Sequence, residues 1–149
     1  MLAIKSILHP TDFSQSAGNA FLYARALAKQ YGAQILLLHV IQLPVVGPAG
    51  TVPSPPPAPP IDREALKAQL KAIATANPEL QIEFSLAENE PASAILDAAG
   101  QSGCDVIVMG THGRTGLSRV LMGSVAERVV RSATCPVLTV KTPLQEGQQ

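Results

Sequence analysis

Short apolar runs alternate along this chain with longer segments whose apolar residues recur at helical spacing, and this alternation most constrains the fold. The run at residues 34–41 is apolar almost throughout, which is typical of a strand covered on both faces in a parallel sheet. Strands are predicted on this basis at residues 4–9, 34–41, 81–86, 105–109 and 136–140.

Four helices are predicted between these strands, because apolar residues recur there three and four positions apart. Ser14 and Asp62 are expected N-caps, Pro91 suits a first helical turn, and Gly32 and Gly103 suit helix ends. The predicted helices follow Ser14 as far as Gly32, run from Asp62 to before Pro78, run from Pro91 to Gly103, and span residues 125–133.

Strands that alternate with helices predict an α/β fold with a parallel sheet and helices on both faces. If the first and fourth strands are neighbours, the strand order is 3-2-1-4-5. The loops at residues 10–14 and 110–124 then flank one crevice, at the reversal of winding where such sheets bind ligands.

Composition limits the function. The 149 residues suit one domain, and the zero net charge argues against a general nucleic-acid or anionic membrane surface. Aromatic residues make up only 3%, too few for base-stacking platforms. No secretory signal or apolar run long enough for a membrane span is recognised, so a cytoplasmic location is expected.

The segment at residues 44–60 holds eight of the thirteen prolines and cannot be helix or central strand. It is predicted to be a long exposed loop within the single domain, extending over about residues 42–60. A surface insertion is the plainer interpretation, and a docking ligand of the PxxP type is the alternative.

Glycines cluster between the fourth strand and the fourth helix. Gly110 and Gly113 are expected to allow positive φ and close approach of the backbone to a ligand. Gly123 and Ser124 open the last helix, where the N–H groups of Ser124 and Val125 can bind a phosphate. With Arg114 to neutralise charge, the loop predicts an anion site.

Asp12, after Pro10 and Thr11, stands at the tip of the first strand. It has two interpretations: a turn or cap residue, or a cleft carboxylate that accepts ribose hydroxyls or helps to hold a hydrated cation. Among the histidines, His9 and His39 are expected to be structural, and only His112 is expected near a ligand.

Other nucleotide and hydrolase motifs are absent, namely GxxxxGK[ST], GxGxxG after the first strand, and GxSxG. Cys104 and Cys135 form no CxxC motif. Buried reduced thiols are the plainer interpretation. A redox pair is the alternative, because both cysteines precede strands that would be neighbours in the sheet.

The pattern Gly110-x2-Gly113-x9-Gly123-Ser124 resembles the nucleotide-binding signature of the universal stress protein family. Residues 7–14, 36–40 and 135–140 look like the first, second and last strands of that family. The resemblance covers nearly the whole chain except residues 44–60.

This resemblance implies the strand order 3-2-1-4-5, the ATP-binding subgroup, and a divalent cation, Mg²⁺, that bridges the phosphates. It implies that Asp12 approaches the ribose, the main chain of Val40 reads adenine, and Met109 packs on the nucleoside. The residues implied to hold the phosphates are Gly110, His112, Gly113, Arg114, Gly123, Ser124 and Val125. It also implies a homodimer formed through residues 137–140, and an apolar edge strand there needs such a cover.

Three functions remain open. The first is a nucleotide-binding regulatory switch, in which ATP changes dimer shape or affinity for a protein partner. The second is a slow ATPase or self-phosphorylating enzyme, for which only Asp12 and His112 are candidate bases and to which no catalytic residue is assigned. Ser124 or Thr111 would then receive the phosphoryl group. The third is a sensor of AMP or a cyclic nucleotide.

Overall fold

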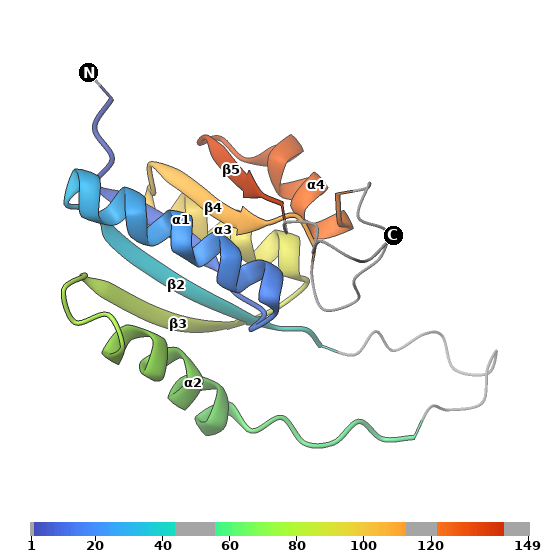
Figure 1. Ribbon diagram of the computed structural model, residues 1–149. Helices are drawn as coiled ribbons and strands as arrows, with labels where there is room; N and C mark the ends of the chain where they lie inside the picture. Colours follow the sequence, from blue (N-terminus) through green and yellow to red (C-terminus); the bar gives the residue numbers. More distant parts are fainter. Residues whose placement is uncertain (1, 44–55, 113–121, 142–149) are drawn as a thin grey trace, which may run out of the picture.

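A five-stranded parallel sheet forms the centre of the computed structural model, which describes residues 2–43, 56–112 and 122–141 (Figure 1). The strand order β3-β2-β1-β4-β5 confirms the predicted order. The strands are β1 (Ser6–Pro10), β2 (Gln34–Ile41), β3 (Ile82–Glu88), β4 (Val106–Gly110) and β5 (Val137–Val140). The helices are α1 (Gln15–Tyr31), α2 (Arg63–Thr75), α3 (Pro91–Ser102) and α4 (Ser124–Ser132).

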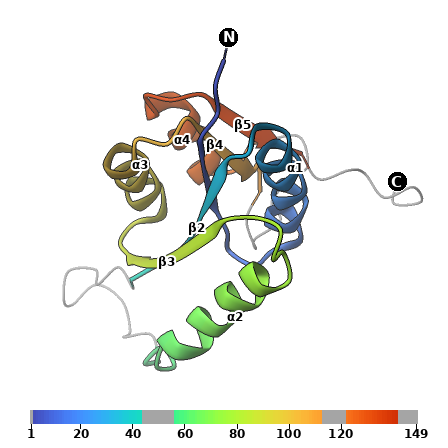
Figure 2. The ribbon, with the colours of Figure 1, turned by 90° about the vertical axis from the view of Figure 1, so that its left-hand side faces the viewer.

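The helices cover both faces of the sheet. Helices α1 and α2 lie on one face, and α3 and α4 lie on the other (Figure 2). This arrangement follows from right-handed crossovers, because the chain moves from β1 to β3 in one direction and returns past β1 to β4 and β5. The winding therefore reverses between β1 and β4.

Local caps set the helix boundaries close to the predicted ones. The Ser14 and Asp62 side chains accept hydrogen bonds from the backbone N–H groups of Ala17 and Ala65, as expected of N-caps. Gly32 and Gly103 adopt the left-handed conformation after α1 and α3, with φ of 65° and 61°.

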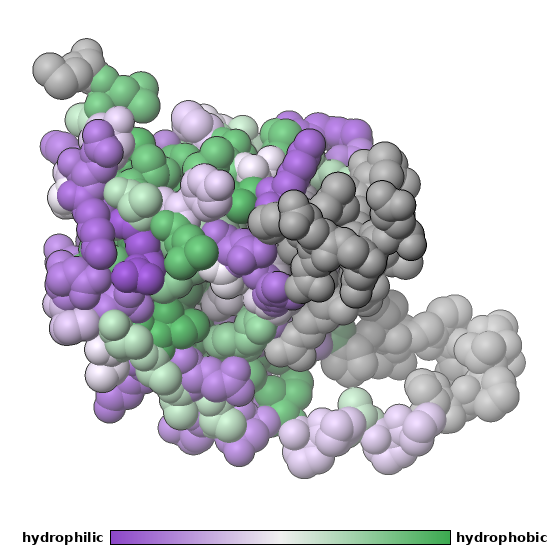
Figure 3. Space-filling view, viewed as in Figure 1, coloured by the Kyte–Doolittle hydropathy of each residue, from purple (hydrophilic) through white to green (hydrophobic). Residues whose placement is uncertain are grey.

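The core consists of two apolar layers, one on each face of the sheet. Along β1, Ile7 packs in the layer beneath α1, and Leu8 packs in the layer beneath α3 and α4. Helix α1 buries small residues against the sheet, including Ala20, Ala24 and Ala28, so its backbone approaches the strands closely. On the face that carries α1, hydrophilic and hydrophobic residues are interspersed (Figure 3).

Strand β3 is longer than predicted and ends at Glu88. Phe84, expected on its apolar face, stays 39% exposed because β3 is an edge strand. Most of the predicted proline-rich loop lies outside the described residues. Its last part, residues 56–60, is exposed and has no regular secondary structure. None of the helices in the described part of the chain has the length and apolar character to cross a membrane.

His9 is buried in the sheet, which confirms its predicted structural role. Its Nδ1 lies 2.8 Å from the carbonyl oxygen of Val108, and its ring lies against Phe21 with the centroids 5.4 Å apart. Burial lowers the pKa of His9 from 6.5 to about 4, although the hydrogen bond to Val108 opposes the shift. The imidazole is therefore neutral in the folded protein at neutral pH.

The buried neutral His9 should make stability depend on pH between 6.5 and 4. In that window the unfolded chain binds a proton that the folded protein does not, so stability falls as pH falls. The free energy of unfolding should drop by about 3 kcal/mol over this range from His9 alone. Urea unfolding at a series of pH values measures the slope. His9→Gln should flatten the curve, and an equally steep curve in that variant would contradict the assignment.

Candidate functional site

A cleft of about 650 Å³ opens at the carboxyl ends of the central strands, on both sides of the reversal between β1 and β4. Its walls come from the loop after β1, the ends of β2 and β4, and the N-terminal turns of α3 and α4. Helix α2 contributes Leu66, preceded by Ile61. A cleft of this size can hold a small organic ligand.

The cleft brings together every predicted site residue that the structure describes. These are Pro10, Thr11, Asp12, Val40, Met109, Gly110, His112, Gly123, Ser124 and Val125. The two remaining predicted residues, Gly113 and Arg114, lie outside the described residues. Segments more than a hundred positions apart in sequence thus line one space.

The loop after β1 is held by its own side chains. The Thr11 hydroxyl accepts a hydrogen bond from the backbone N–H of Phe13 at 3.1 Å, and Asp12 Oδ1 accepts one from Ser14 at 3.0 Å. The Thr11 N–H donates to the carbonyl oxygen of Leu38 at 2.8 Å. Asp12 therefore has the predicted turn role and also lines the cleft, so the two interpretations are compatible.

Phe13 has a positive φ of 62°, unusual for a residue with a bulky side chain. Its ring lies on that of His39, with centroids 4.7 Å apart, and Nδ1 of His39 lies 2.8 Å from the carbonyl oxygen of Thr11. His39 lines the cleft as His112 does, a position that the sequence did not lead us to expect. The structural role expected of His39 is confirmed, since its contacts with Thr11 and Phe13 support the loop after β1.

Gly110 is required by packing, and the expectation of a positive φ there is wrong. Among the described glycines, only Gly32 and Gly103 have positive φ. A Cβ on Gly110 would stand 2.3 Å from the Ser16 hydroxyl oxygen and 3.0 Å from Ser16 backbone atoms. Because α1 approaches β4 this closely, only glycine fits at the end of the strand.

Gly123 is the N-cap of α4 and has a φ of −61°, so glycine is favoured there by lack of space and not by a positive φ. A Cβ there would stand 3.0 Å from the carbonyl oxygen of Thr111, which accepts a hydrogen bond from the Gly123 N–H at 2.7 Å. This contact joins the end of β4 to the start of α4. It places the first turn of α4, with Ser124 and Val125, on the cleft wall.

The N-terminus of α4 differs from those of the other helices. Ser14, Asp62 and Glu90 cap α1, α2 and α3 through their side chains, whereas the N-cap of α4 is Gly123, and no described side chain makes a cap hydrogen bond there. The first N–H groups of a helix need acceptors and lie at the positive end of its dipole. An anionic ligand in the cleft would supply such acceptors.

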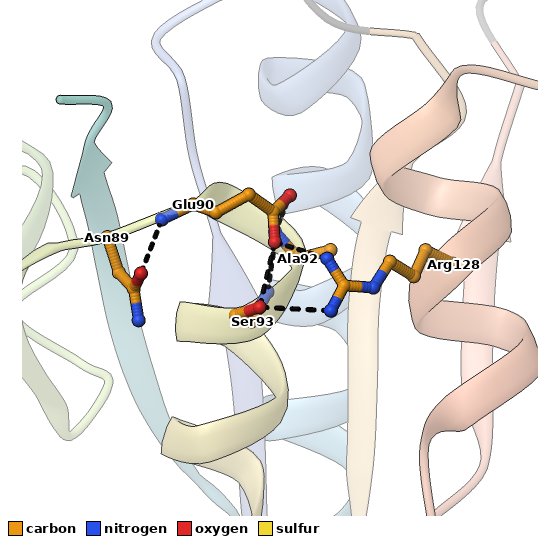
Figure 4. Close-up of polar contacts among 5 residues, drawn as sticks. All are labelled: Asn89, Glu90, Ala92, Ser93 and Arg128. Atoms are coloured by element: carbon orange, nitrogen blue, oxygen red, sulfur yellow. Dashed lines mark hydrogen bonds and ion pairs between the residues drawn. The ribbon is translucent and has the colours of Figure 1, made fainter. Parts of the chain in front are cut away.

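Sequence reasoning missed the contribution of α3 to the cleft, made by Glu90, Pro91 and Ile95. The Glu90 carboxylate accepts hydrogen bonds from the N–H groups of Ala92 and Ser93 and pairs with Arg128 of α4 (Figure 4). These interactions lower the pKa of Glu90, with the Ser93 N–H as the largest favourable cause. The sequence did offer a signal for this contribution, because Pro91 marks the start of α3. The connection from β3 to β4 passes over the reversal of winding, so the start of α3 could have been placed beside the cleft.

The described lining residues include two acidic side chains, Asp12 and Glu90, and two imidazoles, His39 and His112. Within residues 2–43, 56–112 and 122–141, no group of three or more His, Cys, Asp or Glu side chains could hold a metal ion. The Thr111 hydroxyl lies 2.9 Å from Nδ1 of His112, but Thr111 is only 3% exposed. The described part of the site thus offers the N-terminus of α4 to an anion.

Comparison with known proteins identifies relatives over almost the whole chain. A family model described as the universal stress protein family matches residues 3–141. Universal stress protein MJ0531 of Methanocaldococcus jannaschii is 37% identical over 150 residues, an alignment that covers 95% of this chain and 85% of that protein.

Solved structures share the fold. Hypothetical protein MJ0577 of Methanocaldococcus jannaschii matches with a TM-score of 0.69 at 28% identity, covering 97% of this chain and 100% of that one. A universal stress protein in complex with cAMP matches with a TM-score of 0.69 at 21% identity, covering 93% and 98%. The Archaeoglobus fulgidus protein in complex with dAMP has a TM-score of 0.62 at 24% identity, covering 95% and 100%. The likeness to the last two is one of fold.

Two glycine-to-alanine variants should have opposite effects on stability. Gly110→Ala should lower the free energy of unfolding by about 1–3 kcal/mol, because the new methyl group meets the Ser16 backbone. Gly100→Ala is the control, since the position is exposed in α3 with nothing within 4 Å of the added Cβ, and it should stabilise by about 0.5–1 kcal/mol. Urea unfolding measures both. If the two variants changed the free energy of unfolding equally, close packing would not be the reason for a glycine at position 110.

Proposed function

The chain belongs to the universal stress protein family, and on this premise we propose that it binds ATP in the cleft and acts as a dimeric, nucleotide-dependent regulatory protein. The observation that carries the proposal is the N-terminus of α4, which lines the cleft and receives no side-chain cap from its N-cap residue Gly123 or from another described residue. Three other helices of the same protein satisfy their first turns with their own side chains. A phosphate group is the acceptor that suits the fourth.

The comparisons support an adenine nucleotide as the class of ligand. Proteins of the same fold have been solved in complex with cAMP and with dAMP, both of which carry adenine and one phosphate. A triphosphate tail is our extension, since the glycine pattern of this chain resembles that of the ATP-binding subgroup.

The proposed roles follow from the positions of the lining residues. Asp12 would accept hydrogen bonds from the ribose hydroxyls, and the main chain of Val40 would read the adenine edge. Met109 would pack on the nucleoside.

Phosphate binding is assigned to both ends of the glycine-rich segment. Gly110, His112, Gly123, Ser124 and Val125 line the cleft and would contact the phosphates. Gly113 and Arg114 are proposed to join them on the basis of the sequence alone.

A divalent cation fits this site only as a companion of the nucleotide. Asp12 and Glu90 are the carboxylates among the described lining residues, and no three-residue cluster accompanies them. Mg²⁺ commonly takes one or two carboxylates together with phosphate oxygens and water. When bound it would neutralise phosphate charge, and Asp12 is the side chain proposed to lie near it.

One contact favours a second function, slow ATP hydrolysis or self-phosphorylation. A hydroxyl beside an imidazole can act as an activated nucleophile, and Thr111 and His112 are so placed, 2.9 Å apart. The burial of Thr111 opposes this function, because a phosphoryl acceptor must reach the nucleotide. Asp12→Ala is the control, because Asp12 is a candidate base and the proposed ribose ligand. ATPase activity that is unchanged in this variant would point to a contaminating enzyme.

Calorimetric titration with ATP and Mg²⁺ tests the proposal. We expect binding at micromolar concentration or tighter, and weaker binding of AMP and cAMP if the site holds a triphosphate. Gly123→Val should abolish binding, because its side chain meets the Thr111 carbonyl oxygen and displaces the start of α4. Asp12→Asn should weaken binding about tenfold, the expected effect of losing one charge-assisted hydrogen bond.

Gly100→Ala is the control for the titration and should bind ATP like the wild type, since Gly100 lies outside the cleft. Circular dichroism verifies that every variant is folded. No binding by the wild type, with no nucleotide retained through purification, would exclude the proposed site. Tighter binding of AMP or cAMP than of ATP would favour the sensor. Equal affinity for a protein partner with and without ATP would exclude the switch.

We place the dimer interface at β5, an edge strand on which Leu138 is 37% exposed. Leu138→Lys should shift the protein toward monomer in sedimentation velocity, because a lysine in an apolar strand interface is left unpaired. Phe84→Lys, at the opposite edge on β3, is the matched control and should leave the dimer intact. Dissociation by Phe84→Lys alone would move the interface to β3.

A further inference from the structure

Two thiols lie side by side near the amino ends of β4 and β5, at the end of the sheet opposite the cleft. Cys104 lies between α3 and β4, and Cys135 lies between α4 and β5. The parallel pairing of β4 with β5, with Ile107 opposite Val137, brings the two connections together. The sulfur atoms are 3.9 Å apart, and both cysteines are free.

The two thiols differ in access to solvent. Cys104 is only 6% exposed and belongs to the core layer beneath α3 and α4, whereas Cys135 is half-buried at its border. Burial, together with the neighbouring Cys135, raises the pKa of Cys104 to about 11. Cys104 is therefore a protonated thiol at neutral pH, and a dissolved oxidant meets Cys135 first.

We propose that Cys104 and Cys135 are a redox modification site, at which a low-molecular-weight disulfide such as oxidised glutathione converts the two thiols into a reversible intramolecular disulfide. The proposal is independent of the proposed nucleotide function, since neither cysteine lines the cleft.

The reaction balances as two thiol–disulfide exchanges. The Cys135 thiolate attacks one sulfur of oxidised glutathione, forms a mixed disulfide and releases one glutathione thiolate. The Cys104 sulfur, after losing its proton to solvent, then attacks the Cys135 sulfur and releases the second glutathione. The two cysteines are oxidised by two electrons in total, and one oxidised glutathione is reduced to two molecules of glutathione.

The close approach of the two sulfur atoms favours formation of the bond. The sulfurs must close from 3.9 Å to about 2.05 Å. Each cysteine lies in a connection outside the bounds of helix and strand, where its side chain can rotate without changing the backbone of a helix or strand. Two cysteines within neighbouring central strands would have less freedom to move together, because the sheet hydrogen bonds hold the strand backbone in place.

The disulfide would constrain the segment that forms one wall of the cleft. The cysteines are 31 positions apart, and the loop they close contains β4 and α4. Closing a loop of this length limits the unfolded chain, and the resulting stabilisation should raise the melting temperature by about 10 °C. Oxidation is thus expected to stabilise the fold without any ligand.

Intact mass spectrometry of the full chain after incubation with oxidised glutathione tests the proposal. The wild type should lose about 2 Da, the mass of two hydrogens, with no lasting glutathione adduct. It should return to its original mass with dithiothreitol. Non-reducing electrophoresis should show no new covalent dimer, and the oxidised protein should melt at the higher temperature.

Single substitutions separate the two steps. Cys104→Ala should hold a stable glutathione adduct on Cys135, because the resolving thiol is absent. Cys135→Ser should react far more slowly, because only the buried thiol remains. An unchanged wild-type mass, a glutathione adduct that is never resolved, or a disulfide between two chains would each overturn the proposal. These readouts need no nucleotide, so they fail or succeed separately from ATP binding.

Discussion

The parallel pairing of β1 with β4, with Leu8 opposite Ile107, is the constraint on which the rest of the structure depends. It reverses the winding of the sheet, so the first two helices cover one face and the last two cover the other. It also sets the loop after β1 beside the loop after β4. The cleft lies at this reversal because no crossover helix fills the space between the two strand ends.

Close packing of α1 against the sheet supports this arrangement. Buried alanines along α1 let its backbone approach the sheet, and Gly110 accepts that approach because any side chain would meet Ser16. The same layer buries His9 without charge. In the loop after β1, the Thr11 N–H donates to the Leu38 carbonyl oxygen, and Phe13 has a positive φ and packs against His39.

Helices α3 and α4 run between the two ends of the sheet, which differ in their chemistry. At the carboxyl ends of the strands, Glu90 caps α3 and pairs with Arg128 of α4, and no described side chain caps the first turn of α4. At the amino ends of β4 and β5, the two helices lead to Cys104 and Cys135, whose sulfur atoms are 3.9 Å apart. A ligand would act at one end of this pair of helices and an oxidant at the other.

The sequence by itself determined the kind of each element and its bounds to within a few residues, because hydrophobic spacing and caps such as Ser14 and Gly32 act locally. With the family resemblance, it also indicated the strand order and ten of the 22 described residues that line the cleft. Only the tertiary structure decided why Gly110 is glycine, that His39 and the α3 N-terminus reach the cleft, and how near the thiols lie. These facts depend on how closely a helix packs and where a crossover returns over the sheet. Such distances arise from contacts between residues far apart in sequence, and local patterns do not encode them.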